Sequence, residues 1–187
     1  MEDLIKITTY NGRGLRQQAK RRKVFAFLHR QNYHLAFIQE THSTSRDERF
    51  WSNEWGGRVV YSHGSSRSRG VCILFNPKLD FSIVHSSIDT HGRYILLDIK
   101  FSSHIFTLVG VYAPNTDSPL FFDLLTNELR DCACNNVIIG GDFNFVFSLN
   151  CDKKGGIAQT NFHARDHCLD LMACYDLVDV WRERNPH

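Results

Sequence analysis

A short apolar run leads into two glycines, an acid and an amide in the octet Val137-Ile138-Ile139-Gly140-Gly141-Asp142-Phe143-Asn144. Three β-branched apolar residues in succession are typical of a strand that is buried on both faces. The two glycines allow the backbone to turn sharply after the strand. In folds built from sheets and helices, residues that contact a ligand cluster just beyond the carboxyl ends of such strands. Asp142 and Asn144 are therefore candidate site residues, although Gly, Asp and Asn are also common in ordinary turns.

Elsewhere the chain alternates predicted strands with fewer predicted helices. β-branched or aromatic residues bounded by turn residues predict strands at residues 4–10, 33–39, 58–62, 70–76, 81–86, 93–101 and 105–112. Apolar residues at helical spacing predict helices at residues 16–30, 46–54, 120–131 and 162–175. Residues 62–69, 113–118 and 150–156 are polar breaks, and residues 177–181 are expected to start a further strand or turn. Strands interleaved with a few helices favour layered sheets flanked by helices over a helical bundle.

Length and composition predict a single globular domain over residues 1–187. The 187 residues are enough for one domain with a sizeable core and too few for two. Hydrophobic residues make up 42% and charged residues 22%, which is ordinary for a globular protein. The six cysteines form no paired framework and no secretory leader is recognisable, so we expect a soluble intracellular protein with reduced thiols. No run approaches the ~18 apolar residues of a membrane span, so no membrane partner is expected.

The net charge of +2 does not by itself indicate nucleic-acid binding. Basic residues nevertheless gather near the first predicted helix and in the Ser/Gly-rich loop 62–69, and we select Arg13, Arg16, Lys20, Arg67 and Arg69 as candidate nucleic-acid contacts. The first group is equally compatible with the solvated face of a helix. His163, His167, Cys168 and Cys174 lie close together in the sequence, but their spacing matches no standard zinc finger, so structural or incidental roles are favoured.

Polar side chains stand at the ends of four predicted strands. Asn11 follows the first and Glu40 the second, Tyr112 ends a third, and Asp142 and Asn144 follow the fourth. Carboxylate and amide oxygens suit Mg²⁺, with Mn²⁺ as an alternative, and Mg²⁺ also accepts a substrate phosphate. Phosphodiester cleavage needs a cation on the phosphate oxygens, an activated water and help for the leaving oxygen. Glu40 is the best metal ligand of the set.

The other residues have matching candidate roles. Asn11 is assigned to the metal, phosphate or water, Asp142 to orienting or deprotonating the water, Asn144 to phosphate or water, and Tyr112 to a hydrogen bond. Each also has an ordinary explanation, as a solvated acid, a turn residue or a core tyrosine with a satisfied hydroxyl. It is their joint occurrence that favours a site. His42 and His63 lie in loops and are interpreted as surface residues.

Four motifs carry a resemblance to a known family. They are Tyr10-Asn11-Gly12, Ile38-Gln39-Glu40-Thr41-His42, Gly110-Val111-Tyr112-Ala113-Pro114-Asn115 and Gly140-Gly141-Asp142-Phe143-Asn144, in this order. The chain resembles the endonuclease/exonuclease/phosphatase superfamily, in particular the apurinic-type endonuclease domain of non-LTR (LINE-type) retrotransposons. The resemblance implies an α/β (α+β) four-layer sandwich, two mostly antiparallel sheets packed face to face with helices outside. It also implies Mg²⁺-dependent nicking of DNA that leaves a 3′-hydroxyl for target-primed reverse transcription.

The chain also departs from this family. Past a segment that resembles residues 182–187, the superfamily continues with a further strand, an Ile-Asp-containing strand and a Ser-Asp-His motif, and this sequence has none of these after residue 182. We therefore expect a domain that is incomplete at its C-terminus, lacks its last strands, and is weak or inactive as an enzyme. The alternatives are a non-catalytic remnant that binds DNA or protein, and a phosphoesterase that acts on another substrate. A chromosomal substrate would imply nuclear residence, although the sequence leaves nuclear and cytoplasmic locations open.

Overall fold

The computed structural model describes residues 5–132, 136–152, 155 and 161–186. Its strands form two sheets of four strands each. The first sheet has the order β1 (Ile7–Asn11), β2 (Leu35–Gln39), β4 (Val71–Phe75) and β3 (Val59–Ser62). The second has the order β5 (Ser82–Ile88), β6 (Tyr94–Phe101), β7 (His104–Tyr112) and β8 (Val137–Asp142). The pairs β1–β2 and β7–β8 are parallel and the other four pairs are antiparallel.

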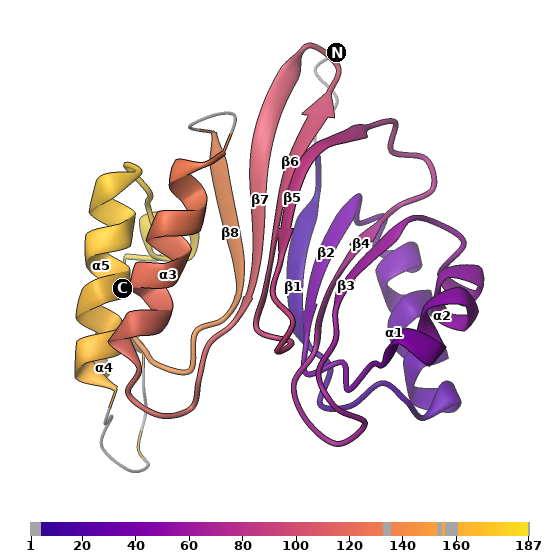
Figure 1. Ribbon diagram of the computed structural model, residues 1–187, viewed down its shortest axis with the longest axis horizontal. Coiled ribbons are helices and arrows are strands. Elements are labelled where there is room, and N and C mark those ends of the chain that lie inside the picture. Colours follow the sequence, from indigo (N-terminus) through magenta and orange to yellow (C-terminus); the bar gives the residue numbers. More distant parts are fainter. Residues whose placement is uncertain (1–4, 133–135, 153–154, 156–160, 187) are drawn as a thin grey trace.

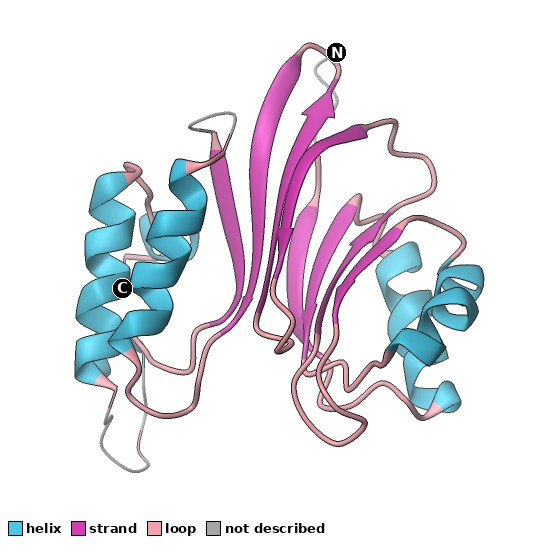
Figure 2. Cartoon of the chain, in the orientation of Figure 1, coloured by secondary structure: helices cyan, strands magenta, loops and turns pink. Residues whose placement is uncertain are grey.

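The helices cover the outer faces of the two sheets (Figures 1 and 2). A 3₁₀ turn, η1 (Ser45–Asp47), leads into α2 (Glu48–Trp55), which covers the first sheet together with α1 (Gln18–Arg30). The helices α3 (Pro119–Arg130) and α5 (Phe162–Cys174) cover the second sheet. The predicted four-layer sandwich, with mostly antiparallel sheets and outer helices, is thereby confirmed. In the described part of the chain, no helix has the length and apolar composition required to cross a membrane.

Three predictions about local structure were wrong. Residues 150–156 were expected to be a loop, but Leu149–Asp152 form the short helix α4. Residues 177–181 were expected to start a strand or turn, whereas Val180–Arg184 form the helix α6, whose first amides are capped by the Asp179 carboxylate. The run beginning at Val137 was expected to be buried on both faces, but β8 is the outermost strand of its sheet and is only partly buried.

At the interface between the two sheets, one aromatic ring of the first sheet packs against two glycines of the second. Gly110 of β7 and Gly140 of β8 are neighbours in the parallel register, and Phe37 of β2 is almost fully buried against both. A Cβ atom on Gly140 would lie 2.5 Å from Cδ2 of Phe37, and one on Gly110 would lie 3.1 Å from Cδ1. The absence of side chains at these positions therefore allows the ring to pack directly on the backbone of the facing sheet.

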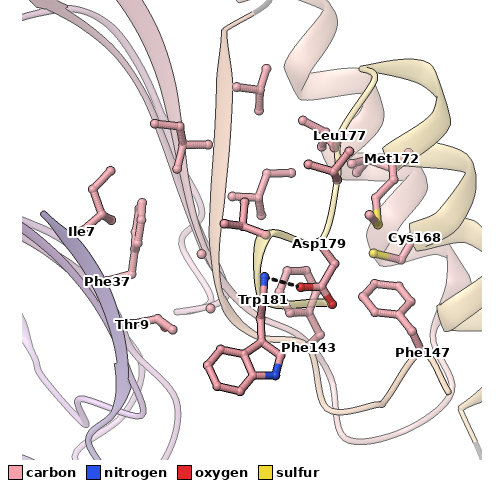
Figure 3. A pocket seen from close by; sticks show the side chains of 18 of the residues that line it. Ile7, Thr9, Phe37, Phe143, Phe147, Cys168, Met172, Leu177, Asp179 and Trp181 are labelled. Atoms are coloured by element: carbon pink, nitrogen blue, oxygen red, sulfur yellow. Dashed lines mark hydrogen bonds between the residues drawn. The ribbon is translucent and has the colours of Figure 1, made fainter. Parts of the chain in front are cut away.

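An apolar groove of about 780 Å³ runs along the uncovered edge of β8 (Figure 3). Ile7 and Phe37 lie on the side of β8 that faces the first sheet, and Phe147 and Cys168 lie on the side of the outer helices. Trp181 of α6 contributes to the lining and remains 70% exposed. The partial burial of β8 follows from this open edge, because within the described residues no further strand pairs with it.

Candidate active site

The site lies where the carboxyl ends of two parallel strand pairs face each other. Parallel pairing places the end of β1 beside the end of β2, with Asn11 opposite Gln39, and Glu40 follows directly. It likewise places Tyr112 at the end of β7 opposite Asp142 at the end of β8. Because the two sheets pack face to face, these four strand ends meet at one edge of the sandwich.

The Asn11 side chain joins the two sheets. Its Nδ2 donates to Oε1 of Glu40 at 2.8 Å and to Oδ2 of Asp142 at 2.7 Å. Its Oδ1 accepts a hydrogen bond from the backbone N–H of Arg13 at 3.0 Å, which fixes the orientation of the amide. Two carboxylates that are 102 residues apart in the sequence are therefore held on one amide group.

The backbone is strained at two of the candidate site residues, Glu40 and Asn144. Glu40 has φ +49° and Asn144 has φ +56°, both in the left-handed region that is uncommon for residues other than glycine. The Glu40 carbonyl accepts from the Gly14 N–H at 2.7 Å. Asn144 donates its backbone N–H to Oδ1 of Asp142 at 3.1 Å and its side-chain Nδ2 to the Ala113 carbonyl at 2.7 Å. These contacts hold both segments in a conformation that the chain would otherwise avoid.

Tyr112 is buried beside Glu40, with its ring under a guanidinium group. Burial raises the pKa of the Tyr112 phenol, and the negative charge of Glu40 raises the pKa further. The guanidinium carbon of Arg93 lies 4.9 Å from the centre of the tyrosine ring. Nη1 of Arg93 also donates to the carbonyls of Tyr112 and Ala113, at 3.3 and 3.1 Å. The phenol, already protonated at neutral pH at the ordinary tyrosine pKa of about 10, therefore stays protonated to higher pH and can donate a hydrogen bond.

A cavity of about 420 Å³ opens beside these groups. Its lining comprises Glu40, His42, Arg67, Ser68, Arg69, Arg93, Tyr112, Pro114, Asn115 and Thr116. Arg93 and His42 are among the lining residues that were not selected from the sequence. Arg93 directly precedes β6 in an ordinary turn and gave no signal. His42 was interpreted as a surface residue, although its ring packs against Gly14 and lines the cavity.

The basic residues selected from the sequence divide into two groups. Arg67 and Arg69 line the cavity that contains Glu40. The other three lie outside its lining, on the segment after Asn11 and the start of α1, where Nζ of Lys20 donates to the Arg13 carbonyl at 2.8 Å. The Arg16 guanidinium lies 4.0 Å from the Asp47 carboxylate and is therefore already near a counter-charge.

The donor set suits a hard divalent cation. Glu40 and Asp142 supply carboxylate oxygens, and Asn11 orients both carboxylates by donating from its Nδ2. Mg²⁺ is bound in proteins by one or two carboxylates while it keeps several waters and takes up a substrate phosphate. Within the described residues, no three His, Cys, Asp or Glu side chains cluster closely enough to form a complete metal cage. The residues present thus fit an open, water-rich site for Mg²⁺ or Mn²⁺.

The histidines of α5 have other partners. Nδ1 of His163 lies 2.7 Å from Oδ2 of Asp117, and Nδ1 of His167 lies 2.6 Å from Oδ1 of Asp123. Cys168 is buried against α3, where burial raises the pKa of its thiol to about 12. These contacts give the side chains a structural role between the helix α5 and the α3 region.

Comparison with known proteins assigns the fold to a family. The model of the Endonuclease/Exonuclease/phosphatase family matches residues 8–167. The chain belongs to this family. An uncharacterised 149 kDa protein of transposon TX1 from Xenopus laevis is 33% identical over 188 residues, a match that covers 97% of this chain and 14% of that protein. The chain thus spans about one seventh of the length of this relative.

Three solved endonuclease structures have the same fold as this chain. The AP endonuclease LMAP of Leishmania major has a TM-score of 0.77 at 17% identity, over 97% of this chain and 70% of that one. An AP endonuclease of Archaeoglobus fulgidus has a TM-score of 0.73 at 20% identity, over 98% and 76%. The endonuclease domain of the telomere-specific non-LTR retrotransposon TRAS1 has a TM-score of 0.63 at 16% identity, over 91% and 72%. The predicted relationship to retrotransposon and apurinic endonucleases is confirmed.

Proposed function

We propose that this domain is a Mg²⁺-dependent DNA endonuclease of retrotransposon type, which nicks one phosphodiester bond and leaves a 3′-hydroxyl for target-primed reverse transcription. The observation that carries the proposal is the Asn11 amide, which lies between the Glu40 and Asp142 carboxylates at 2.8 and 2.7 Å. The transposon relative and the endonuclease structures support the same choice of chemistry. A chromosomal target would place the protein in the nucleus.

Glu40 would hold the cation, and Asn11 would orient the Glu40 carboxylate through Nδ2, since its Oδ1 accepts from the Arg13 N–H. A bound Mg²⁺ or Mn²⁺ would supply positive charge to the phosphate oxygens. Asp142 would orient a water and accept its proton, because its carboxylate lies beside the Glu40 side chain without being bonded to a cationic group among the described residues. The hydrogen bonds from Asn11 to Glu40 and Asp142 would thus also determine where the water and the phosphate lie.

Tyr112 and Asn144 would hold the phosphate. A tyrosine hydroxyl, with an ordinary pKa of about 10, is protonated at neutral pH. Tyr112, whose pKa is raised further, would therefore donate a hydrogen bond to a phosphate oxygen and add no negative charge to the site. Asn144 is anchored by its side chain to the Ala113 carbonyl, which follows Tyr112 directly. The two residues that face the phosphate are therefore positioned by one strand end.

DNA would be bound along the basic residues that surround the site. Arg67 and Arg69 line the cavity, and Arg13, Arg16 and Lys20 extend the positive surface along the loop after β1. Contacts of this kind bind the phosphate backbone without reading sequence.

The proposal is tested by nicking of supercoiled plasmid in the presence of Mg²⁺. We expect Glu40→Gln and Asp142→Asn to lower the nicking rate by roughly 100-fold or more, because each removes a charge that acts on the reacting phosphate or water. Glu183→Gln is the matched control, since Glu183 is exposed on α6 and makes no ion pair within the described residues. The nicked product should be extended by a DNA polymerase without phosphatase treatment. Equal nicking by wild type and Glu40→Gln, or nicks that cannot be extended, would overturn the proposal.

A further inference from the structure

The first turn of α5 is capped by a side chain from a distant loop. Asn161 directly precedes α5, a position from which an asparagine side chain ordinarily accepts hydrogen bonds from the first amides of its helix. The Asn161 side chain caps none of the described amides of α5. Asp117, in the loop after β7, accepts instead from the backbone N–H groups of His163 and Ala164, at 3.3 and 2.7 Å. The Asn161 amide is therefore used for other contacts.

These contacts join the two loops that leave the second sheet at the candidate site. The Asn161 side chain is buried, with 4% of the residue exposed. Its Nδ2 donates to the carbonyls of Asn115 and Asn144, at 3.1 and 3.0 Å. Asn115 lies in the loop after β7 and lines the cavity beside Tyr112, and Asn144 lies in the loop after β8. One amide at the start of an outer helix thus holds both loops.

Asn144 depends on such support because its backbone is strained. Its φ of +56° lies in the left-handed region, which a residue other than glycine adopts only where its surroundings enforce it. Its backbone N–H donates to Asp142, and its side chain donates to the Ala113 carbonyl. The bond from Asn161 holds its carbonyl. Three hydrogen bonds to three different residues therefore fix both the backbone and the side chain of Asn144.

Resting on the proposed function, we propose that Asn161 is a positioning residue for the reaction. By holding the carbonyls of Asn115 and Asn144, it sets the Asn144 amide against the phosphate and does not contact the phosphate itself. Asp117 fixes the helix end from which Asn161 acts. A displacement of about 1 Å at a group that contacts the reacting atoms can cost about 100-fold in rate. The positioning of the phosphate thus extends from the strand ends to the first turn of α5.

The catalytic test is a double-mutant cycle on the rate of plasmid nicking. Asn161→Asp keeps the shape of the side chain and removes both N–H donors, so it should lower the rate by roughly 10- to 100-fold. Asn144→Gly removes the positioned amide, and glycine tolerates the φ at this position. In the Asn144→Gly background, Asn161→Asp should lower the rate by less than about threefold, because the group that Asn161 positions is gone. Equal fold losses in both backgrounds would indicate a merely structural role and would overturn the proposal.

Asn161→Ala is the second variant, since it removes the donors without adding a negative charge, and it should behave in the cycle as Asn161→Asp does. Asn76→Ala is the matched control. Nδ2 of Asn76 also donates to a backbone carbonyl, that of Tyr33, at 3.0 Å. Asn76 follows β4 at the end of the first sheet that is opposite Glu40, because the last residue of β4 pairs with the first residue of β2. The control should nick at the wild-type rate.

Hydrogen exchange separates this proposal from the proposed reaction. In protein that contains isotope-labelled asparagine, exchange of the Asn144 backbone amide reports how firmly its loop is held. Both Asn161 variants should speed this exchange by about tenfold, as expected for the loss of one or two hydrogen bonds, and Asn76→Ala should leave it unchanged. Unchanged exchange in the Asn161 variants would overturn the positioning role. Faster exchange in these variants together with no nicking by wild type would overturn the proposed reaction and leave the hold of Asn161 on Asn144 intact.

Discussion

Asn11 is the residue on which the candidate site depends most. It is the last residue of β1, and its amide is the group that contacts the carboxylates of both sheets. Taken singly in the sequence, Asn11 was more readily explained as a turn residue beside Gly12. The strand ends that carry Asn11, Glu40, Tyr112 and Asp142 were predictable from apolar runs followed by polar residues. Their contacts across 131 residues of sequence were not, because they depend on how the two sheets pack.

Tyr112 provides a pH-dependent prediction at this scale. Its pKa is raised by burial and by Glu40, so the folded protein binds the phenolic proton more tightly than the unfolded chain does. The stabilisation from this proton is therefore complete below the ordinary tyrosine pKa of about 10 and is lost as the pH rises through the folded-state pKa. Between pH 9 and 11, urea unfolding should show a larger loss of stability for wild type than for Tyr112→Phe. Parallel losses in the two proteins would contradict the assignment.

Among the elements, β8 shows both what sequence patterns predict and what they leave out. Its three β-branched residues and two glycines predicted a strand with a site at its end, and the strand is present. Its position at the edge of the sheet was not predictable, since apolar content does not reveal whether a neighbour pairs with the strand. The helix α6 was missed for a related reason: five residues are too few for a helical period to be recognised without the Asp179 cap.

Gly141 allows β8 to approach β7 closely. A Cβ atom at this position would lie 2.0 Å from the Val111 carbonyl oxygen, which is backbone and cannot move aside. Gly141→Ala should therefore lower the free energy of unfolding by about 3 kcal/mol, at the upper end of the usual cost of overpacking. A Cβ atom on Gly110 would contact only side-chain atoms, at 3.1 Å or more. Gly110→Ala should therefore lower the free energy of unfolding by about 1 kcal/mol. Chemical denaturation of both variants provides the comparison, and equal costs would argue against the close approach.

At the scale of the whole molecule, the packing of one sheet on the other determines the site. Phe37 lies three residues before Glu40, and Gly140 lies two residues before Asp142. The contact between the Phe37 ring and the glycine backbone thus sets how far the two carboxylates lie from each other. The layered architecture was predictable from the order of strands and helices, whereas this pairing of an aromatic ring with two glycines on the opposite sheet carries no local sequence signal.

Removal of the ring should therefore affect both stability and the site. Phe37→Ala should lower the free energy of unfolding by about 3–5 kcal/mol, because Phe37 is only 1% exposed and the cavity would open between rigid sheets. Phe27→Ala, on the exposed face of α1, is the control and should cost less than about 1 kcal/mol. Phe37→Leu should fall between them. If the Phe37 and Phe27 variants lose similar amounts of unfolding free energy in urea, the Phe37 ring does not stabilise the packing of the two sheets.

The central claim is that strand ends of the two sheets bring Glu40, which holds a divalent cation, beside Asp142, which acts on the attacking water. Anomalous diffraction from crystals soaked in Mn²⁺ tests it most directly, because Mn²⁺ accepts the oxygen ligands that suit Mg²⁺ and scatters anomalously. We predict one strong peak at the Glu40 carboxylate in the wild-type protein and no peak there in Glu40→Gln. A wild-type crystal without a peak at Glu40, or a peak that persists in Glu40→Gln, would contradict the account.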